Sequence, residues 1–577
     1  MKTTFRNLLV AVLLMGASIA SAQQVNTLYF LENAPMRHII NPAFQPVSKV
    51  YVTLPVIGYT SLWAGNDAFT MQDLIFKDAT TGNTITPLHP NANPEWLDKK
   101  PNKVLFDADV YLNLLGFGFR VKDFGYVHVN ISEHIIGGVG IGKELFGLND
   151  LSSGIIGPFS LGANATVYTD IALGYSHKIN DQWTVGGKFK FLVGQAYLHS
   201  EIDNLALETG YEQLHLIGGG MVDAAIPMRL PDISGQISSL EDLGLSTLPL
   251  QDIREWLKPA GYGGVIDLGM TYKPIKQLQV SASITDLGFI HWKNSAQGSV
   301  TLDASYTGVT MDFDNLFTNG VFDFEKILDN IANKLEGYAN ALQFGDVNTN
   351  KGINQMITAN LNVGVDANFW DNRVGVGVYS RTRFYNSRIT EEVTLGAAFR
   401  PFNWLNLAAS YSFINGHWSN MGAALSIAPY DGIMLTLATD YIPLTYAKAA
   451  TESGKTIPLP YKTPGVNVSF GLAIVAGTNP KNKDKDKDGV FDKLDICPNT
   501  PLNVRVDEMG CPWDNDGDGV PDYMDECPHT PSAAYGMIDT VGCPLDTDGD
   551  GVPDYRDLCP ETPEAAYGMI DENGCPL

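Results

Sequence analysis

The stretch Asn360-Leu-Asn-Val-Gly-Val-Asp-Ala-Asn-Phe369 decides the fold of this chain. Its apolar residues recur at every second position from Leu361 to Phe369, and polar or small residues fill the positions between them. Successive side chains of a β-strand point to opposite faces, so this spacing gives one strand an apolar face and a polar face. The pattern predicts a half-apolar strand.

The same alternation returns along the chain, in residues 277–284, 405–413 and 466–474. Strands of this kind suit the wall of a membrane barrel, whose outer face meets lipid and whose inner face lines a polar lumen. A soluble protein built of several β-sheets would alternate in the same way. The lengths of the connections between the strands therefore have to distinguish a membrane barrel from a soluble β-protein.

Short turns and longer or more polar connections alternate along the body of the chain. The tight turns are Lys122-Asp123-Phe124, Asn180-Asp181, Pro274-Ile275-Lys276, Asp371-Asn372, Pro401-Phe402-Asn403 and Tyr430-Asp431-Gly432. The long connections include residues 204–261, 293–355 and 443–464. This alternation is typical of outer-membrane barrels, in which the short turns face the periplasm.

Aromatic residues accompany the tight turns and predict an interfacial girdle at that rim. They are Phe124, Trp183, Tyr272, Trp370, Trp404 and Tyr430.

The number of turns sets the number of strands. Six turns join twelve strands, and an opening strand at 50–57 and a closing strand at 466–475 bring the total to about fourteen. We therefore expect an all-β chain, with a transmembrane antiparallel β-barrel of about fourteen strands at residues 50–477 and a loop-rich tail after it. An even strand number places both ends of the barrel on the periplasmic side.

The N-terminus resembles a secretion signal over residues 1–22. Lys2 and Arg6 precede a short apolar run, and Ala20-Ser21-Ala22 is a small-residue cleavage site. Residues 23–49 are expected to form an N-terminal segment or plug at the base of the barrel, because Asn41-Pro42 and Gln45-Pro46 interrupt regular structure.

The segment Asn33-Ala-Pro-Met-Arg-His-Ile-Ile-Asn-Pro-Ala-Phe-Gln-Pro46, with Leu54-Pro-Val-Ile-Gly58 after it, resembles the opening of a Bacteroidota outer-membrane barrel family of unknown function. More distantly it is similar to the long-chain fatty-acid transporter family, which has an Asn-Pro-Ala element near an N-terminal hatch. The resemblance implies a barrel over residues 23–477. An ordinary turn before a strand is the alternative interpretation of Asn41-Pro42-Ala43.

Three acidic loops follow a linker at 478–483 and occupy residues 484–577. Each twelve-residue loop has carboxylates at positions 1, 3, 5, 9 and 12, a glycine at position 6, and a main-chain carbonyl at position 7. This supply of oxygen ligands is what calcium prefers. The predicted calcium ligands are Asp484, Asp486, Asp488, Val490, Asp492 and Asp495; Asp514, Asp516, Asp518, Val520, Asp522 and Asp525; and Asp546, Asp548, Asp550, Val552, Asp554 and Asp557.

The loops resemble EF-hand loops, but each ends in Asp and no long helices flank them. With their Cys-Pro flanks they are similar to thrombospondin type 3 repeats, which implies bound calcium and a tail that stiffens with it. An acidic linker without metal is the alternative. OmpA-like proteins often carry such repeats before a peptidoglycan-binding domain, whereas this chain stops at Leu577, which leaves cell-wall anchoring in doubt.

All six cysteines lie between Cys497 and Cys575, which suggests disulfides in an oxidising compartment. Pairing of nearest neighbours (497 with 511, 527 with 543, 559 with 575) and pairing between adjacent repeats both remain open. The chain carries a net charge of −26, and the 23 acidic and 7 basic residues from 481 onwards supply −16 of it. Such a tail attracts cations and repels nucleic acid.

No motif for nucleophilic, phosphate-loop or zinc-protease chemistry is present in the sequence, which favours a protein that is not an enzyme. The leading hypothesis is a transporter or porin-like barrel in the outer membrane, with periplasmic repeats. Lys188, Lys190, Arg381 and Arg383 fall on polar strand faces, where they would attract anionic solutes or hydrophobic acids. Internal ion pairs are the alternative role for these residues.

Two further functions stay open. The barrel could be a structural anchor or spacer of the OmpA-like kind, or a calcium-dependent adhesion protein, although strand parity argues against an external tail. The expected partners are outer-membrane lipid and periplasmic envelope or peptidoglycan-associated proteins. Residues 324–335 are expected to form a short amphipathic helix in an outer loop.

Overall fold

The computed structural model forms two compact units, Met1–Thr478 and Asn479–Leu577. The structure describes residues 25–74, 76–77, 84–85, 94–144, 154–210, 213–227, 234–237, 258–293, 295–307, 317–318, 321–323, 342–349, 351–385, 388–414, 417–428, 432–442, 446–450, 456–460, 462–477, 485–490 and 495–577. The expected helix at 324–335 lies outside these residues.

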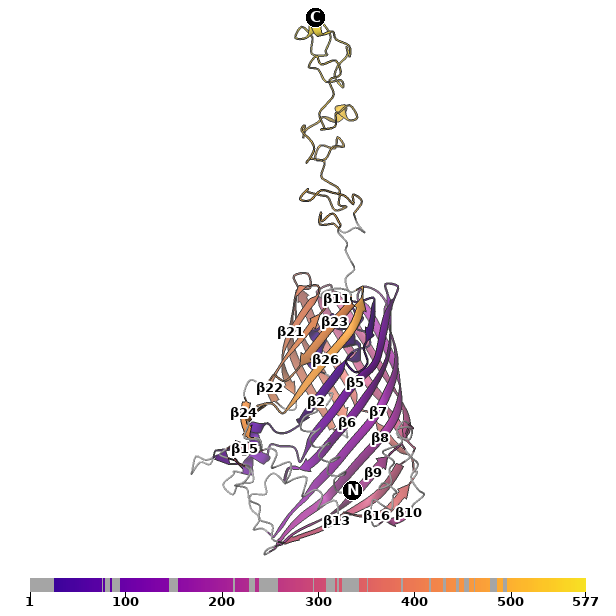
Figure 1. The fold of residues 1–577 in the computed structure, drawn as a ribbon, viewed down its shortest axis with the longest axis vertical. Coiled ribbons are helices and arrows are strands. Elements are labelled where there is room, and N and C mark those ends of the chain that lie inside the picture. The colour runs from indigo at the N-terminus through magenta and orange to yellow at the C-terminus, as the bar shows by residue number, and fades with distance from the viewer. Residues whose placement is uncertain are drawn as a thin grey trace. The chain divides into compact units, whose positions relative to one another are not determined.

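The first unit is an antiparallel barrel of fourteen strand positions (Figure 1), as the sequence predicts. Its strands are β1 (Val50–Thr53) and β2 (Thr60–Asn66), β5 (Lys103–Val121), β6 (Gly125–Gly142), β7 (Ile155–Lys178), β8 (Trp183–Gly210), β11 (Gly261–Ile275), β12 (Leu278–Trp292), β17 (Ile353–Met356), β18 (Ala359–Phe369), β19 (Val374–Tyr385), β20 (Arg388–Phe402), β21 (Leu405–Ile414), β22 (His417–Ile427), β23 (Gly432–Thr439) and β26 (Gly465–Ala476).

The wall closes where the last strand meets the first. Strand β26 pairs with β1 through Val50 and Ala476, and with β2 through Leu62 and Val468. On its other side β26 pairs with β23. Strands β1 and β2 share one position in the wall, as do β17 and β18, which both pair with β12. Each of the fourteen positions therefore has two hydrogen-bonded neighbours, and both ends of the barrel chain reach the same rim.

The predicted turns gather at that rim. Short connections join β5 to β6, β7 to β8, β11 to β12, β18 to β19, β20 to β21 and β22 to β23. Aromatic residues mark this rim: Trp183 stacks on Tyr272 with ring centroids 4.4 Å apart, and Trp370 is 74% exposed. The central residues of the sixth turn, Tyr430 and Asp431, lie outside the described part of the chain.

The first strand differs from its prediction. A single strand was expected at 50–57, but β1 ends at Thr53 and β2 resumes at Thr60. Pro55 has no N–H to donate to the ladder, and Val56 has a φ of 65°. The break leaves the wall closed, since the Val56 N–H donates to the Asn113 carbonyl and the Leu472 N–H to the Ile57 carbonyl.

The long connections contain more structure than expected. Strands β9 (Gln213–Ala225), β13 (Ser295–Thr307), β16 (Leu342–Thr349) and β10 (Ser234–Ile237) pair in this order next to β8 and extend the sheet past the barrel. Two smaller sheets hold β3 (Phe76–Lys77) and β4 (Thr84–Ile85), and β14 (Phe317–Thr318), β15 (Val321–Asp323), β24 (Tyr446–Ala450) and β25 (Thr456–Pro460). Continued pairing satisfies backbone groups that a loop would leave to solvent.

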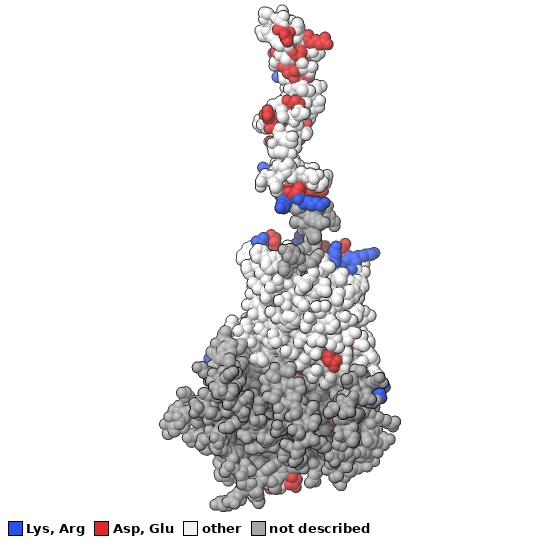
Figure 2. Space-filling view, viewed as in Figure 1, with Lys and Arg blue, Asp and Glu red and all other residues white. Residues whose placement is uncertain are grey.

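The outer surface of the wall is apolar. In β18, Leu361, Val363 and Val365 are 39–42% exposed, whereas Asn362 between them is 3% exposed. The apolar face of this alternating strand therefore points outward, as predicted. Figure 2 shows an outer wall almost free of charged side chains above the grey region, with lysine and arginine at the rim.

The N-terminal segment from Val25 to Lys49 lies inside the wall, on the side of the short turns. It contains two 3₁₀ helices, η1 (Asn26–Phe30) and η2 (Pro35–Ile39), which are buried along their whole length. Its apolar residues pack against inward-facing residues of the wall such as Tyr51, Tyr379 and Ala438. This segment is the core of the barrel's turn-side half.

Other helical turns are short. Among the described residues, those in the first unit are η3 (Met71–Leu74) and η4 (Pro94–Leu97), and those in the second are η8 (Ser532–Ala534) and η9 (Glu564–Ala566). Within the described ranges, the structure has no helix with the length and apolar character needed to cross a membrane.

The second unit consists of loops that three disulfides staple. The bonds join Cys497 to Cys511, Cys527 to Cys543 and Cys559 to Cys575. Pairing is therefore between nearest neighbours, and pairing between adjacent repeats is ruled out. Each repeat ends in one isolated antiparallel bridge, such as that between Val506 and Pro512.

A charge in the middle of the apolar outer wall should destabilise the barrel. Val378 is 45% exposed and pairs with Val365 at the centre of two wall strands. We expect Val378→Arg to lower the free energy of unfolding from lipid vesicles by about 2–4 kcal/mol, because the guanidinium must enter hydrocarbon. The same change at the rim, Ile275→Arg, should cost about 0–1 kcal/mol. Equal effects at both positions in a urea titration would contradict a membrane-embedded wall.

Candidate functional site

Hydrogen bonds tie the N-terminal segment to the barrel at its first turn. The Asp440 carboxylate, fully buried, accepts the backbone N–H groups of Asn26 (2.7 Å) and Thr27 (2.8 Å) and the Thr27 hydroxyl (2.5 Å). Asp440 thus caps the orphan donors at the start of η1. The Thr27 hydroxyl also lies 2.6 Å from that of Ser410.

The Asn41-Pro42-Ala43 element fixes the other end of the segment. The Asn41 amide donates to the carbonyls of Met270 (3.2 Å) and Ala282 (3.1 Å), and its oxygen accepts the Ala43 N–H at 2.9 Å. A side chain at Gly269 would collide with Asn41, and one at Gly186 with the Pro42 carbonyl. The element is therefore a turn that docks on the wall where two glycines let it approach.

Buried ion pairs lie inside the barrel next to the N-terminal segment. Lys190 Nζ lies 2.5 Å from Asp286 and 2.9 Å from Asp267. Lys188 donates to the His38 carbonyl at 3.2 Å and lies 3.8 Å from Asp267. These residues come from β8, β11 and β12, and they join three wall strands to η2.

A second buried pair lies across the barrel. The Arg381 guanidinium on β19 is 2.6 Å from the Glu392 carboxylate on β20, and both side chains are at most 2% exposed. The Asn26 amide donates to the same carboxylate at 2.9 Å. For Lys188, Lys190 and Arg381 the structure thus shows internal ion pairs, the alternative to free lumen charges.

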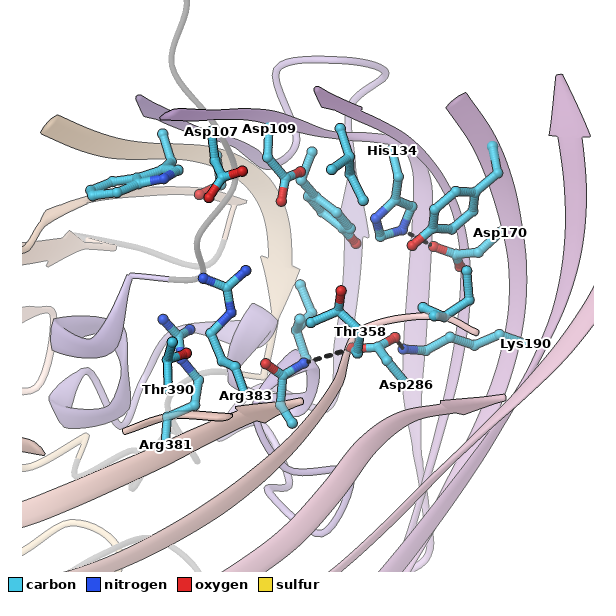
Figure 3. A pocket seen from close by; sticks show the side chains of 18 of the residues that line it. Asp107, Asp109, His134, Asp170, Lys190, Asp286, Thr358, Arg381, Arg383 and Thr390 are labelled. Atoms are coloured by element: carbon cyan, nitrogen blue, oxygen red, sulfur yellow. Dashed lines mark hydrogen bonds and ion pairs between the residues drawn. The ribbon is translucent and has the colours of Figure 1, made fainter. Parts of the chain in front are cut away.

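Lys188, Lys190, Asp286 and Arg381 help to line a cavity of about 140 Å³ inside the barrel. Figure 3 shows Asp107 and Asp109 of β5 on one wall and Arg381 and Arg383 of β19 facing them. Tyr59, Trp63, Tyr168 and Ile357 add aromatic and apolar surface. His134 contacts Asp170 at 2.7 Å and stacks on Tyr168. Such a lining offers both charge signs and an apolar body to a small solute.

Sequence reasoning missed most of the acidic partners in this interior, including Asp267, Asp286, Glu392 and Asp440. A weak signal exists: Asp267 lies between Ile266 and Leu268, at the inward position of an alternating strand. A lone carboxylate at such a position indicates a buried partner, because an unpaired charge there would be costly.

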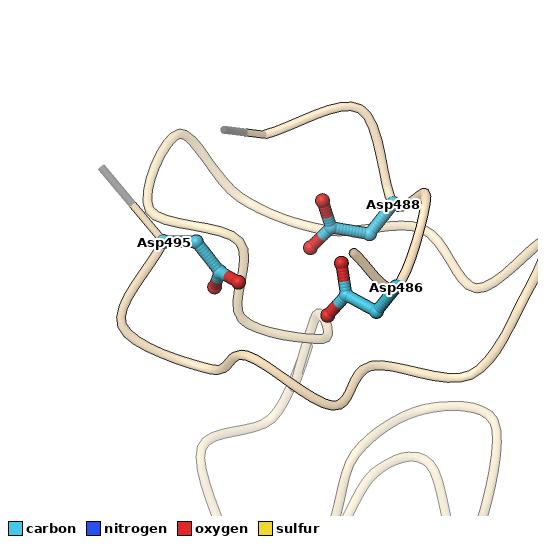
Figure 4. A group of neighbouring side chains, drawn as sticks. All are labelled: Asp486, Asp488 and Asp495. Atoms are coloured by element: carbon cyan, nitrogen blue, oxygen red, sulfur yellow. The ribbon is translucent and has the colours of Figure 1, made fainter. Parts of the chain in front are cut away.

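The acidic loops bring carboxylates together in each repeat. The groups close enough to share one ion are Asp486, Asp488 and Asp495; Asp514, Asp516 and Asp518; and Asp546, Asp548 and Asp550. Figure 4 shows the first group, with its three carboxylates turned toward one another. Of the predicted ligands, Asp484 and Asp492 lie outside the described residues.

Two buried carboxylate oxygens fit a cation site in the second and third loops. Asp518 Oδ2 and Asp550 Oδ2 occupy the same place in these loops, and each is buried with no hydrogen-bond donor. Uncompensated buried carboxylate oxygens are costly, so a hard cation with oxygen ligands fits this donor set.

The carboxylates at position 9 have a different role in the described loops. Asp522 accepts the Asn515 N–H at 2.7 Å, and Asp554 accepts the hydroxyl (2.6 Å) and N–H (2.7 Å) of Thr547. The Thr547 hydroxyl and N–H together hold the pKa of the Asp554 carboxyl below its ordinary value. These residues close the loop by hydrogen bonds.

Each disulfide segment is tied to the loop before it by a threonine that sequence reasoning missed. The Thr530 N–H donates to Asp516 at 2.6 Å and its hydroxyl to the Gly542 carbonyl at 2.7 Å. Thr500 and Thr562 make the same contacts. Their recurrence three residues after Cys497, Cys527 and Cys559 was a visible signal.

The first loop departs from the others. Lys485 and Lys487 place two cations within it, and Lys487 has a φ of 64° where the other loops have Gly517 and Gly549, both at 79°. A non-glycine residue is strained in this region. The first loop is therefore the least suited of the three to a cation.

Comparison with known proteins assigns both units. Residues 42–440 match a family of unknown function, DUF5723. The chain belongs to this family. Residues 482–504, 507–534 and 539–566 match the thrombospondin type 3 repeat. Both matches confirm the resemblances seen in the sequence, and no curated protein matches the chain.

Solved structures similar to the chain are distant. The Ralstonia pickettii toluene transporter TbuX is 11% identical with a TM-score of 0.35, and the match covers 77% of this chain and 94% of TbuX. A Pseudomonas aeruginosa FadL homologue is 12% identical with a TM-score of 0.34, covering 76% and 93%. The Pseudomonas putida toluene transporter TodX is 10% identical with a TM-score of 0.30, covering 76% and 92%. At these TM-scores and identities, the similarity gives no information about the function of this chain.

The Arg381–Glu392 pair gives a test of the buried network. We expect Arg381→Met to lower the free energy of unfolding by about 3–5 kcal/mol, because Glu392 would stay buried without its counter-charge. Adding Glu392→Gln should restore part of the loss, measured by denaturant titration of the purified barrel. A double variant less stable than Arg381→Met would contradict an energetic coupling between the two side chains.

Proposed function

We propose that the first unit is an outer-membrane barrel that passes small solutes, and that residues 25–49 close its path on the periplasmic side. The observation that carries the proposal is a closed wall with an apolar exterior around a charged interior cavity. An apolar exterior fits lipid as the barrel's partner, and a cavity lined by charges of both signs and by apolar groups fits a small solute. We propose no enzymatic activity.

The orientation follows from the turns. Bacterial outer-membrane barrels keep their short turns in the periplasm. Both ends of this barrel's chain reach the rim of short turns, which supports a periplasmic N-terminal segment and a periplasmic start of the tail. Protease digestion of intact cells tests the placement, since a tail outside the cell would be cut.

We further propose that the three acidic loops bind calcium through the carboxylates that lie together in each loop, which are Asp486, Asp488 and Asp495; Asp514, Asp516 and Asp518; and Asp546, Asp548 and Asp550. Three observations support a hard divalent ion: the aspartates grouped in each loop, the buried Asp518 and Asp550 oxygens that accept no hydrogen bond, and the glycine turns. Without calcium the clustered carboxylates repel one another, so binding of the ion should stiffen each repeat.

A structural role is the second candidate. Disulfide-stapled repeats stiffened by calcium suit a spacer that meets a periplasmic envelope or peptidoglycan-associated protein. Capture of envelope proteins that depends on calcium, and is lost on chelation, would favour the spacer over the channel. Adhesion outside the cell fits the orientation less well.

A removable crosslink tests the channel. Thr27 and Ser410 lie in direct hydroxyl contact, so Thr27→Cys with Ser410→Cys should form a disulfide between the N-terminal segment and β21. We expect the oxidised variant to block solute uptake into liposomes and reduction to restore it. Wild-type protein in the same reductant controls for the tail disulfides. Equal uptake with the crosslink closed and open would refute a path through the segment.

Single neutralisations test the calcium loops. We expect Asp518→Asn or Asp550→Asn to weaken binding at its own loop about tenfold or more, because a charged ligand is lost. Glu564→Gln removes the same charge from an exposed position outside the loops and should leave binding unchanged. Calorimetric calcium titration of the full chain measures both. Identical isotherms for all three variants would exclude these ligands.

A further inference from the structure

A second, smaller cavity of about 30 Å³ opens between the N-terminal segment and the rim of short turns. Its lining includes Arg37 of η2, Lys273 and Lys276 near the β11–β12 turn, and Arg400 near the β20–β21 turn. The volume exceeds what one water molecule needs. Neither the proposed solute path nor the calcium loops account for it.

Arg37 is the unusual member of this lining. Its side chain is 9% exposed, and its Nε is buried without an acceptor. Among the described residues, the guanidinium makes no hydrogen bond and no ion pair; it only lies over the rings of Phe44 (4.2 Å) and Tyr29 (5.6 Å). Ring faces offset part of a cation's burial but leave its N–H donors unpaired.

The neighbouring groups are already engaged. Arg400 donates to Asn368 (3.0 Å) and to the Asn372 carbonyl (3.0 Å), and it lies 3.6 Å from Glu32. Asp366 accepts the Tyr29 hydroxyl at 2.8 Å and so has a partner of its own. Within the described part of the chain, no acid of the lining forms a hydrogen bond or an ion pair with the Arg37 guanidinium.

The charge of the cavity is positive. Four cations (Arg37, Lys273, Lys276 and Arg400) face two acids, Glu32 and Asp366. Lys273 and Lys276 are exposed at the rim, where they raise the local concentration of anions. A buried cation with unpaired donors in a positive cavity fits an anionic ligand with planar or tetrahedral oxygens.

We propose that this cavity is an oxyanion site, in which Arg37 holds a carboxylate or phosphate group at the turn-side mouth of the barrel. The group could belong to a free anion, to the head of an amphiphilic acid or to a lipid headgroup. The site does not depend on transport, so binding at Arg37 and solute uptake can fail separately.

Binding by purified full-length protein tests the proposal, with inorganic phosphate and octanoate as soluble probes in calorimetric titrations. Nanodiscs of anionic phosphatidylglycerol and of zwitterionic phosphatidylcholine supply the lipid arm, read by competition with the soluble probe. Competition by phosphatidylglycerol alone would assign the site to a headgroup. Stronger binding of octanoate than of phosphate would assign it to an amphiphilic acid, and the reverse to a free anion.

Variants locate the site. Arg37→Gln should weaken binding about tenfold or more, because charge-assisted hydrogen bonds are lost. Lys273→Gln with Lys276→Gln changes only exposed residues, so folding is not at stake, and it should weaken binding at low salt and flatten its salt dependence. Arg373→Gln, an exposed rim arginine outside the cavity, is the matched control and should bind as wild type.

Saturable binding that Arg37→Gln abolishes and Arg373→Gln retains would establish the site. No saturable binding of either probe, or equal loss in both arginine variants, would overturn it. Heat-modified migration of the folded barrel on gels shows that each variant is folded. If Arg37→Gln does not fold, the lysine pair decides the outcome, and unchanged binding there overturns the proposal.

Discussion

The need to pair every backbone amide and carbonyl within the wall governs this structure. In the membrane that we propose for this barrel, lipid offers no hydrogen bonds, so a strand at the edge of an open sheet would carry unpaired groups into hydrocarbon. The pairing of β26 with β1 and β2 removes that edge. Even the break between β1 and β2 obeys the rule, because its N–H and carbonyl groups bond to β5 and β26.

Closing the wall creates a second problem, which is the interior. A barrel of this size encloses more space than its inward side chains fill. The chain solves this on one half with its own N-terminal segment, whose apolar residues form the core there. The polar ends of that segment need partners in turn, and Asp440, Glu392 and Lys188 supply them. The other half keeps a charged cavity.

The sequence could predict features that repeat over a few neighbouring residues, but it could not predict contacts between residues far apart along the chain. Strands, turns and acidic loops repeat within a few residues, so period and spacing revealed them. The contact of Asn26 with Asp440 joins positions 414 residues apart, and no local pattern announces it. The same holds for Arg37, whose surroundings come from three distant turns. Pro55 indicates the break between β1 and β2. The predicted strand at 50–57 nevertheless runs through it, because the alternation of apolar and polar residues around Pro55 favours one continuous strand.

The disulfides have a consequence for how the tail changes over evolutionary time. Each bond closes within one repeat, and each repeat has its own threonine tie and its own acidic loop. No disulfide joins one repeat to the next in the described tail. Duplication or deletion of a single repeat therefore leaves the others correctly bonded. The length of the tail can grow or shrink in whole increments, as in other repeat proteins, without any change to the barrel that carries it.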